Sequence, residues 1–470
     1  MAERPLWTFA ELAQATGGTL TGLTDDAAQI ANGVTFDSRA LAPGDVFLAL
    51  KGARDGHDFV PQAFASGAAI AVVKRPLEGG ACLLVPDVQK ALEDMAVFAR
   101  DRAPDCCRGA VTGSVGKTSV TQMVMQGLRR AGKAHSAVKS FNNHIGVPLT
   151  LARMPADTMR AVFEIGMNHA DEITPLSEFV EPRAVVITTV GAVHTENFPD
   201  GEAGVARAKA EIFDGLTPGG LAILNADNRW FEFLSSEARG AGALVAAFGE
   251  QGGVDAQLIA HRILGDRAQI EARYHGRDIA FSLSHTGRHQ AVNALASLLL
   301  LEALEVDLDT SLAALESFET LEGRGKVVER PFRGGRLTII DESYNANPVS
   351  MRATLQSLGE REIASESHGR KIAVLTDMLE LGADAEAQHV GLLEALERAS
   401  VAQVFLAGPL MKALWDVLPS DMRGVWRETA MELSVDVLNN LHAGDTVMIK
   451  GSNGSKAALI AKALLAVENS

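Results

Sequence analysis

The chain has 470 residues, of which 47% are hydrophobic, so it is long enough for about three domains and can bury a core in each. Its formal net charge of −16 argues against nucleic acid or acidic membrane surfaces as partners. The three cysteines, Cys82, Cys106 and Cys107, lack metal-ligand spacing, and no stretch has the apolar length of a signal peptide or a membrane span. We therefore expect a cytoplasmic globular protein with reduced thiols.

The first eighty residues predict a small α/β domain. Thr8 to Glu11 has the Ser/Thr-x-x-Glu pattern that begins a helix. Strands are expected at residues 34–36, 46–50 and 69–73, with a helix near 61–65. After the first of these strands, Ser38 offers a hydroxyl and Arg39 a fork of donors, which together suit a diphosphate, although the same residues also form ordinary turns.

The stretch from Gly109 to Ala131 predicts a strand, a glycine turn and a helix. In the turn, from Gly113 to Ser119, glycines let the backbone approach a phosphate, and the positive end of the helix faces it. Lys117 would reach the outer phosphates and Thr118 would offer its hydroxyl to Mg²⁺. Val111 stands where the pattern GxxxxGK[ST] has its first glycine, so an ordinary turn with a surface lysine is the alternative.

The remainder of the chain alternates strands with helices. A linking helix at residues 86–103 precedes the phosphate turn, and later strands are expected at residues 160–165, 184–190, 221–224 and 244–248. The alternating pattern of residues 255–283 predicts a strand pair at the sheet edge, and residues 289–304 predict an apolar helix. Strands at 337–340, 372–375, 404–407 and 447–449 begin a second doubly wound unit.

We therefore predict an α/β protein of three domains. A small N-terminal α/β domain spans residues 1–83, and a central domain with a P-loop-type, mostly parallel sheet spans residues 84–320. A C-terminal, Rossmann-like doubly wound domain spans residues 321–470.

Polar side chains follow several predicted strands, at the edge where open α/β sheets bind ligands. Glu164 closes one apolar run, and His194 with Glu196 follows the next, so both clusters suit a metal near the phosphate turn. Lys209 lies in a helix entered from the second loop, and DESYNANP, from Asp341 to Pro348, follows the first strand of the third region. Each cluster alone also suits a structural role, such as a surface carboxylate, a packed histidine, a solvated helix face or a turn.

Taken together, eight motifs carry a resemblance to a known family. In chain order they are TGSVGKTS, FNNHIGVPLTL, FEIGMNH, VHTENF, AKAEIF, GRHQAVNALAS, DESYNANP and TDMLELG. Their joint occurrence, from about Phe36 to Gly454, resembles the Mur ligases, the ATP-dependent amide-forming enzymes of peptidoglycan precursor synthesis. SYNANP paired with DMLELG, without a DNPR motif, favours the member that joins UDP-N-acetylmuramoyl-tripeptide to D-alanyl-D-alanine through an acyl phosphate. We expect a monomer.

The resemblance implies ATP and Mg²⁺ as cofactors and assigns residues to them. The phosphates would lie against Gly113, Ser114, Val115, Gly116, Lys117, Thr118 and Ser119. Mg²⁺ would contact Thr118, Glu164, His194 and Lys209. Lys209 matches a lysine that is carbamylated in several members, and Lys117, Lys209, His194 and Glu164 form the implied catalytic set. The rest of the nucleotide would lie near Asn293 and Arg324, with Asp341 and Glu342 near its ribose.

The resemblance also places the other substrates. Ser38 and Arg39 would belong to the uridine diphosphate site, and Asn143 would be a substrate-side asparagine. Asn345, Asn347 and Asp377 of the third domain would help to bind the incoming dipeptide.

The chain departs from the family pattern at three positions. Glu342 replaces a common second aspartate, Asn453 replaces a common arginine in KGSNGSKAA, and Asp171 replaces a frequent glycine. Two alternatives stay open. One is a ligase of the same kind that adds a different amino acid, or glutamate to folate; the other is a nucleotide switch that binds a partner without joining substrates.

Overall fold

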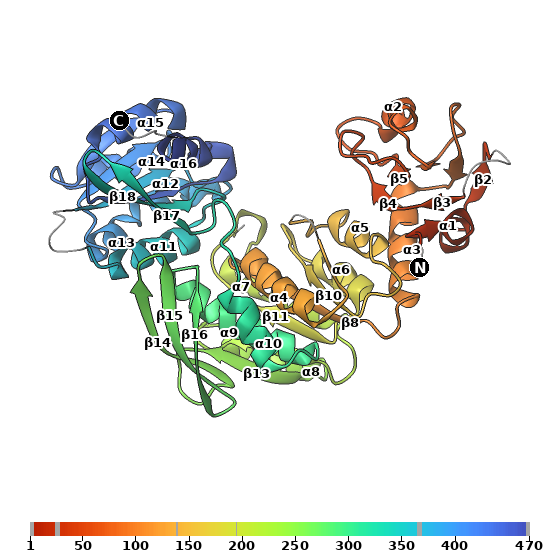
Figure 1. Cartoon of the computed structure of the whole chain (residues 1–470), viewed down its shortest axis with the longest axis horizontal. Helices are drawn as coiled ribbons and strands as arrows, with labels where there is room; N and C mark the ends of the chain where they lie inside the picture. The colour runs from red at the N-terminus through yellow and green to blue at the C-terminus, as the bar shows by residue number, and fades with distance from the viewer. Residues whose placement is uncertain (1–3, 24–28, 138–139, 194, 364–368, 467–470) are drawn as a thin grey trace.

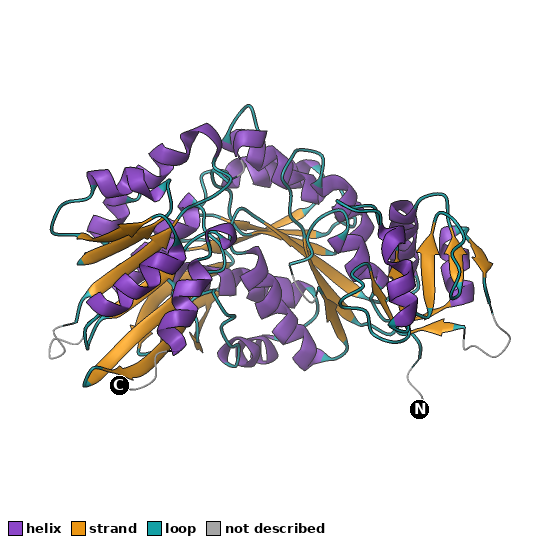
Figure 2. Ribbon diagram, turned by 90° about the horizontal axis from the view of Figure 1, so that it is seen from above, coloured by secondary structure: helices purple, strands orange, loops and turns teal. Residues whose placement is uncertain are grey.

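A computed structural model describes residues 4–23, 29–137, 140–193, 195–363 and 369–466. The chain forms an arc in which the N-terminal, central and C-terminal parts follow one another, each built on its own sheet (Figure 1). Helices cover both faces of the central and C-terminal sheets (Figure 2). The predicted α/β class and its three-part organisation are confirmed, whereas the boundaries after residues 83 and 320 stay predictions. Within the described ranges, no helix combines the length and apolarity that a membrane crossing requires.

The N-terminal part is a mixed sheet with strand order β2-β7-β6-β5-β4, and β1 and β3 form a separate pair. The predicted helix start is confirmed, because Thr8 and Glu11 make a capping box. The indole of Trp7 donates to the Ala152 carbonyl at 2.8 Å, and Arg153 Nε donates to the Val34 carbonyl at 2.6 Å, so this part is fixed to the central one. Its elements are β1 Trp7–Thr8, α1 Phe9–Thr16, β2 Thr19–Thr21, β3 Ile30–Ala31, β4 Gly33–Thr35, β5 Asp45–Leu48, α2 Val60–Ala65, β6 Ile70–Val73, β7 Cys82–Leu84 and α3 Val88–Asp101.

The central sheet has the order β16-β15-β14-β13-β12-β11-β8-β10-β9 and is parallel from β14 to β9. The predicted edge pair at residues 255–283 is wrong: the segment forms three strands, of which β14 continues the parallel sheet and β15 and β16 fold back antiparallel. Helix α9 is apolar on nearly every face because α4, α10 and the sheet surround it.

The elements of this central part are β8 Cys107–Thr112, α4 Lys117–Ala131, β9 Ala134–Ser136, α5 Gly146–Ala152, β10 Arg160–Glu164, α6 Ile173–Val180, β11 Ala184–Ile187, α7 Glu202–Ala210, β12 Leu221–Asn225, α8 Phe231–Gly240, β13 Leu244–Gly249, β14 Ala256–Leu264, β15 Arg267–Tyr274, β16 Arg277–Leu283, α9 Arg288–Ala303 and α10 Leu308–Glu316.

The C-terminal sheet has the order β17-β18-β22-β19-β20-β21, with only β17 antiparallel among the described strands. The sequence patterns did not predict β17 or β21, which lie at the two edges and are only partly buried. Arg361 donates to the Gly265 carbonyl at 2.9 Å and so contacts the turn between β14 and β15 of the central part. The elements are β17 Lys326–Phe332, β18 Gly335–Glu342, α11 Pro348–Glu360, β19 Lys371–Thr376, α12 Ala385–Val390, α13 Leu393–Arg398, β20 Gln403–Ala407, α14 Met411–Val417, β21 Arg423–Arg427, α15 Ala430–Asn440, β22 Thr446–Lys450 and α16 Ala457–Ala466.

Candidate active site

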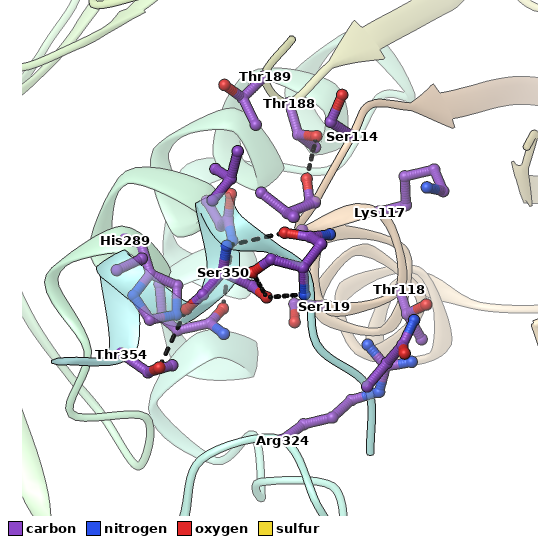
Figure 3. A pocket seen from close by; sticks show the side chains of 18 of the residues that line it. Ser114, Lys117, Thr118, Ser119, Thr188, Thr189, His289, Arg324, Ser350 and Thr354 are labelled. Carbon is purple, nitrogen blue, oxygen red and sulfur yellow. Dashed lines mark hydrogen bonds between the residues drawn. The ribbon is translucent and has the colours of Figure 1, made fainter. Parts of the chain in front are cut away.

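A cavity of about 540 Å³ lies where the central and C-terminal parts face each other. One wall is the turn between β8 and α4, and the opposite wall is the segment from Glu342 into α11. Figure 3 shows Lys117 and Thr118 on the first wall and Ser350 and Thr354 of α11 on the second. Because β8 lies in the interior of its sheet, between β11 and β10, and its carboxyl end opens here, the cavity occupies the usual ligand position of an open α/β sheet.

The turn before α4 has the backbone of an anion-binding loop. Gly116 is the N-cap of α4 with φ 88°, and no side chain caps the helix, so its first N–H groups are available to a ligand. Lys117 Nζ donates to the Gly113 carbonyl at 2.7 Å and therefore lies over the loop. Burial lowers the pKa of Lys117, which an incoming anion would offset.

Neighbouring segments hold this loop in shape. Thr188 Oγ1, after β11, donates to the Val115 carbonyl at 2.5 Å. Ser114 Oγ donates to the Gly191 carbonyl at 3.1 Å and accepts from the Gly191 N–H at 3.0 Å. A Cβ at Gly116 would lie 3.0 Å from the Asn293 side chain, so α9 supports the loop from the other side.

The segment after β11 also touches the C-terminal part. A Cβ at Gly191 would lie 2.7 Å from Cγ2 of Val349 in α11, and one at Gly382 would lie 2.9 Å from Cβ of Glu196. The loop that holds Ser114 is therefore itself in contact with the third domain.

Glu164, at the end of β10, forms an oxygen-rich corner with the start of α4. Thr118 Oγ1 donates to Glu164 Oε2 at 2.8 Å, and Asn142 Nδ2 donates to Glu164 Oε1 at 2.7 Å. Ser140 Oγ lies 3.2 Å from the Thr118 hydroxyl. Mg²⁺ prefers such oxygens and commonly keeps only one or two protein ligands beside phosphate and water. Within the described part of the chain, no group of three His, Cys, Asp or Glu side chains suited to a metal occurs.

Lys209 in α7 is buried, with 3% of its surface exposed. Burial, and secondarily the charge of Lys117, lowers its pKa well below the ordinary value, which favours the neutral amine. Lys209 is not among the described residues that line the cavity. The predicted metal ligand His194 lies outside the described residues.

On the opposite wall, the structure brings most of the predicted nucleotide and dipeptide residues together. Arg324 lies over the ring of Tyr344, with its guanidinium carbon 3.9 Å from the ring centre. The predicted residues that line the cavity on this side are Arg324, Glu342, Asn345 and Asn347, and Asn293 completes the floor. Asn347 also caps α11, because its side chain accepts from the Ser350 N–H at 2.9 Å.

Three predicted residues are engaged elsewhere instead of lining the cavity. Asp341 accepts from Ser343 in its own turn and from the Gly323 N–H before β17. Asn143 Oδ1 accepts from the N–H of Gly146, the first residue of α5, at 2.9 Å, and its neighbour Asn142 lines the cavity. Asp377 accepts from the Met411 N–H at 2.9 Å at the start of α14. The sequence showed polar residues after strands but not which of two neighbours faces the cavity.

The predicted diphosphate residues lie in the N-terminal part, away from this cavity. Ser38 Oγ donates to Gln62 Oε1 at 3.2 Å. The Arg39 guanidinium, with 85% of the side chain exposed, is paired with Asp37 at 2.8 Å. The predicted diphosphate site and the cavity therefore lie on different domains.

Sequence reasoning missed several residues that shape the cavity. These are Asn142, Thr188, Tyr344 and Lys450. Asn142 and Tyr344 stand beside predicted residues, so a signal was present for both. Thr188 and Lys450 end or follow apolar strands, and no spacing rule distinguishes them from other strand ends.

Comparison with known proteins agrees with this geometry. Three family models match consecutive parts of the chain: "Mur ligase family, catalytic domain" at residues 31–96, "Mur ligase middle domain" at 111–301 and "Mur ligase, glutamate ligase domain" at 323–453.

Curated relatives match over nearly the whole length. The UDP-N-acetylmuramoyl-tripeptide--D-alanyl-D-alanine ligase of Escherichia coli is 34% identical, with 97% of this chain and 98% of that protein covered. The protein of the same name from Rickettsia prowazekii is 30% identical, with 90% and 93% covered. A crystal structure of MurF from Acinetobacter baumannii aligns with a TM-score of 0.86 at 28% identity, covering 98% of both chains. A MurF ligase from Thermotoga maritima in complex with ADP has the same fold, with a TM-score of 0.76 at 22% identity and 92% and 96% covered. With family models along its length and these relatives, the chain belongs to the Mur ligase family.

Proposed function

We propose that the chain is an ATP-dependent ligase that joins D-alanyl-D-alanine to UDP-N-acetylmuramoyl-tripeptide in peptidoglycan precursor synthesis. The observation that carries the proposal is a phosphate-type loop facing the SYNANP segment across one cavity, in a chain whose full-length relatives bear that ligase name. The ADP complex of a structural relative supports ATP as the nucleotide.

The chemistry follows from the charge of the substrate. A carboxylate repels a nucleophile, so its oxygen first attacks the γ-phosphorus of ATP; the bond to ADP breaks and an acyl phosphate forms. The dipeptide amine then attacks the acyl carbon, loses a proton to water and expels phosphate, which leaves the amide. The α4 N-terminus and Lys117 face the cavity and stabilise the negative charge of the transferred group.

Thr118 and Glu164 are the described residues that would hold Mg²⁺, because they supply neighbouring hydroxyl and carboxylate oxygens. When bound, the ion supplies positive charge that neutralises the phosphates. Asn142 orients Glu164, and the loop between β11 and α7 contributes His194 in this proposal. Lys209 is proposed as a carbamate, since a neutral buried amine is the form that reacts with CO₂.

The substrates reach this site from the two outer domains. Ser38 and Arg39 would bind the uridine diphosphate on the N-terminal domain, and the substrate's peptide then extends toward the cavity. Asn345 and Asn347 line the C-terminal wall and would receive the dipeptide. In this proposal, the contact between this wall and the loop at Gly191 shields the acyl phosphate from bulk water and so from hydrolysis.

The test is the amine dependence of phosphate release. Purified protein is incubated with ATP, Mg²⁺, UDP-N-acetylmuramoyl-tripeptide and one candidate amine, and phosphate and the new amide are measured together. We expect release only with D-alanyl-D-alanine, and an equal amount of amide by mass spectrometry. Release with a single amino acid instead would indicate a different ligase of the family, and slow release without any amide would indicate a nucleotide switch.

A further inference from the structure

The segment Lys450 to Ser452 at the end of β22 lies beneath the DESYNANP loop and is not used in the proposed reaction. Lys450 Nζ donates to the Asn345 carbonyl at 3.1 Å, and Ser452 Oγ donates to the Ala346 carbonyl at 3.2 Å. Lys450 and Ser452 are 3% and 4% exposed, so these contacts are shielded from water. Buried carbonyls need partners, and the segment supplies one to each of two consecutive residues of the loop.

Lys450 also pairs with the acid that distinguishes this chain from the family pattern. Strands β18 and β22 are parallel with Glu342 opposite Lys450, and Lys450 Nζ lies 3.6 Å from Glu342 Oε2. Burial raises the pKa of Glu342 and lowers that of Lys450, while each charge opposes the shift of the other. The ammonium therefore favours an ionised carboxylate in a place where burial alone favours the neutral acid.

Of the two acids that end β18, Glu342 is the one available to a ligand. Asp341 accepts two hydrogen bonds from Ser343 in its own turn and one from the Gly323 N–H, whereas Glu342 lines the cavity together with Lys450. A glutamate has one more rotatable bond than an aspartate, so its carboxylate needs a partner to keep one direction. Lys450 lies within reach to fix it.

We propose that Lys450 is a positioning residue of the nucleotide site: it pairs with Glu342, keeps that carboxylate directed toward the ribose hydroxyls and fixes the loop at Asn345. The inference rests on the proposed nucleotide site but not on the identity of the amine. Lys450 acts through Glu342, so its removal weakens nucleotide binding by removing the preference for ribose hydroxyls.

The experiment measures equilibrium binding of ADP and of 2′,3′-dideoxy-ADP, in the presence of Mg²⁺, to the full-length protein. Wild type is expected to prefer ADP by about tenfold, the value of one charge-assisted hydrogen bond. Lys450→Met should bind ADP about tenfold more weakly and the dideoxy compound almost unchanged, so the preference disappears. Lys450→Arg should restore most of the preference, because it keeps the charge. Lys462→Met, at an exposed lysine of α16, is the matched control and should bind both nucleotides as wild type does.

Two further variants separate charge from structure. Lys450→Gln keeps an N–H for the Asn345 carbonyl but has no charge, and it should lose the ribose preference while its thermal unfolding midpoint stays near that of wild type. Adding Lys450→Met to Glu342→Gln should weaken ADP binding no further, since both changes remove the same interaction. Equal weakening for both nucleotides, or unchanged ADP binding, would overturn the proposal. If wild type binds ADP but makes no amide, the ligase assignment fails while this inference stands.

Discussion

Replacing Gly113 with alanine tests whether the phosphate loop has room for a side chain at this position. Gly113 has φ 148°, and an added Cβ would lie 1.9 Å from Thr188 Oγ1 and 3.1 Å from Thr188 Cβ. The backbone conformation alone costs an alanine about 1–2 kcal/mol. Thr188 must also move, and it then loses the bond to the Val115 carbonyl, at about 1 kcal/mol. We expect a total of roughly 3 kcal/mol.

The assay is calorimetric unfolding with and without ADP. For a domain of this size, a loss of that magnitude lowers the midpoint of the central-domain transition by about 6–12 °C. Nucleotide binding should weaken in parallel, because the Val115 carbonyl and the amides beside it lose their fixed orientation. Gly240→Ala is the control: no atom lies within 4 Å of its added Cβ, so its midpoint should stay close to wild type.

The substitution Thr188→Ala tests whether the clash between the new methyl group and Thr188 causes the loss of stability. Thr188→Ala removes the oxygen that the new methyl group meets, and alone it costs about 1 kcal/mol. In the Gly113→Ala background it should cost less than that or restore stability. Fully additive losses, or a Gly113→Ala protein with the wild-type midpoint, would refute the steric argument.

Other parts of the chain give three more predictions. Lys117→Met should lower ATP turnover at least a hundredfold, while the unfolding midpoint stays equal or rises because a buried ammonium is removed; a midpoint that falls steeply would contradict this. Asp445→Asn should lower the stability of the C-terminal domain by about 3 kcal/mol in calorimetry, since Asp445 is 0% exposed and pairs with Arg370 at 2.7 Å. Burial lowers the pKa of His135 to about 4, so the unfolded state binds its proton more tightly and stability falls as pH drops from about 6.5 to 4. His135→Gln should reduce that fall in pH-dependent calorimetry, and an unchanged slope would show that other groups cause it.

The fold was largely readable because its core elements carry strong patterns. The strands β8, β10 and β11 contain the buried apolar runs 110–111, 161–163 and 184–187, as expected for a covered parallel sheet. Edge strands such as β17 and β21 have partly buried, mixed patterns, and tertiary pairing decides their state. The prediction of a strand pair at residues 255–283 was wrong for a related reason. An alternating pattern indicates strands but does not show how many strands the segment forms.

The sequence predicted where the candidate site lies, at the turn around Lys117, but not which neighbouring side chains line it. The turn around Lys117 has a local signature, and the structure confirms its order of strand, turn and helix. Which asparagine or acid of a neighbouring pair enters the cavity depends on backbone direction at the strand end. Asn142 and Glu342 line it, whereas Asn143 and Asp341 accept from the backbone N–H groups of Gly146 and Ser343, and no sequence spacing contains that choice.

Gly191 lies at a contact that limits how closely the central and third domains can approach each other. On one side it exchanges two hydrogen bonds with Ser114, and on the other its α-carbon meets Val349 of the third domain. In Gly191→Ala, the added methyl group would clash with Val349 and keep the third domain farther from the nucleotide, without contacting any reacting atom. Such a protein would still bind ATP, but its acyl phosphate would be exposed to solvent. It would therefore hydrolyse ATP without forming the amide.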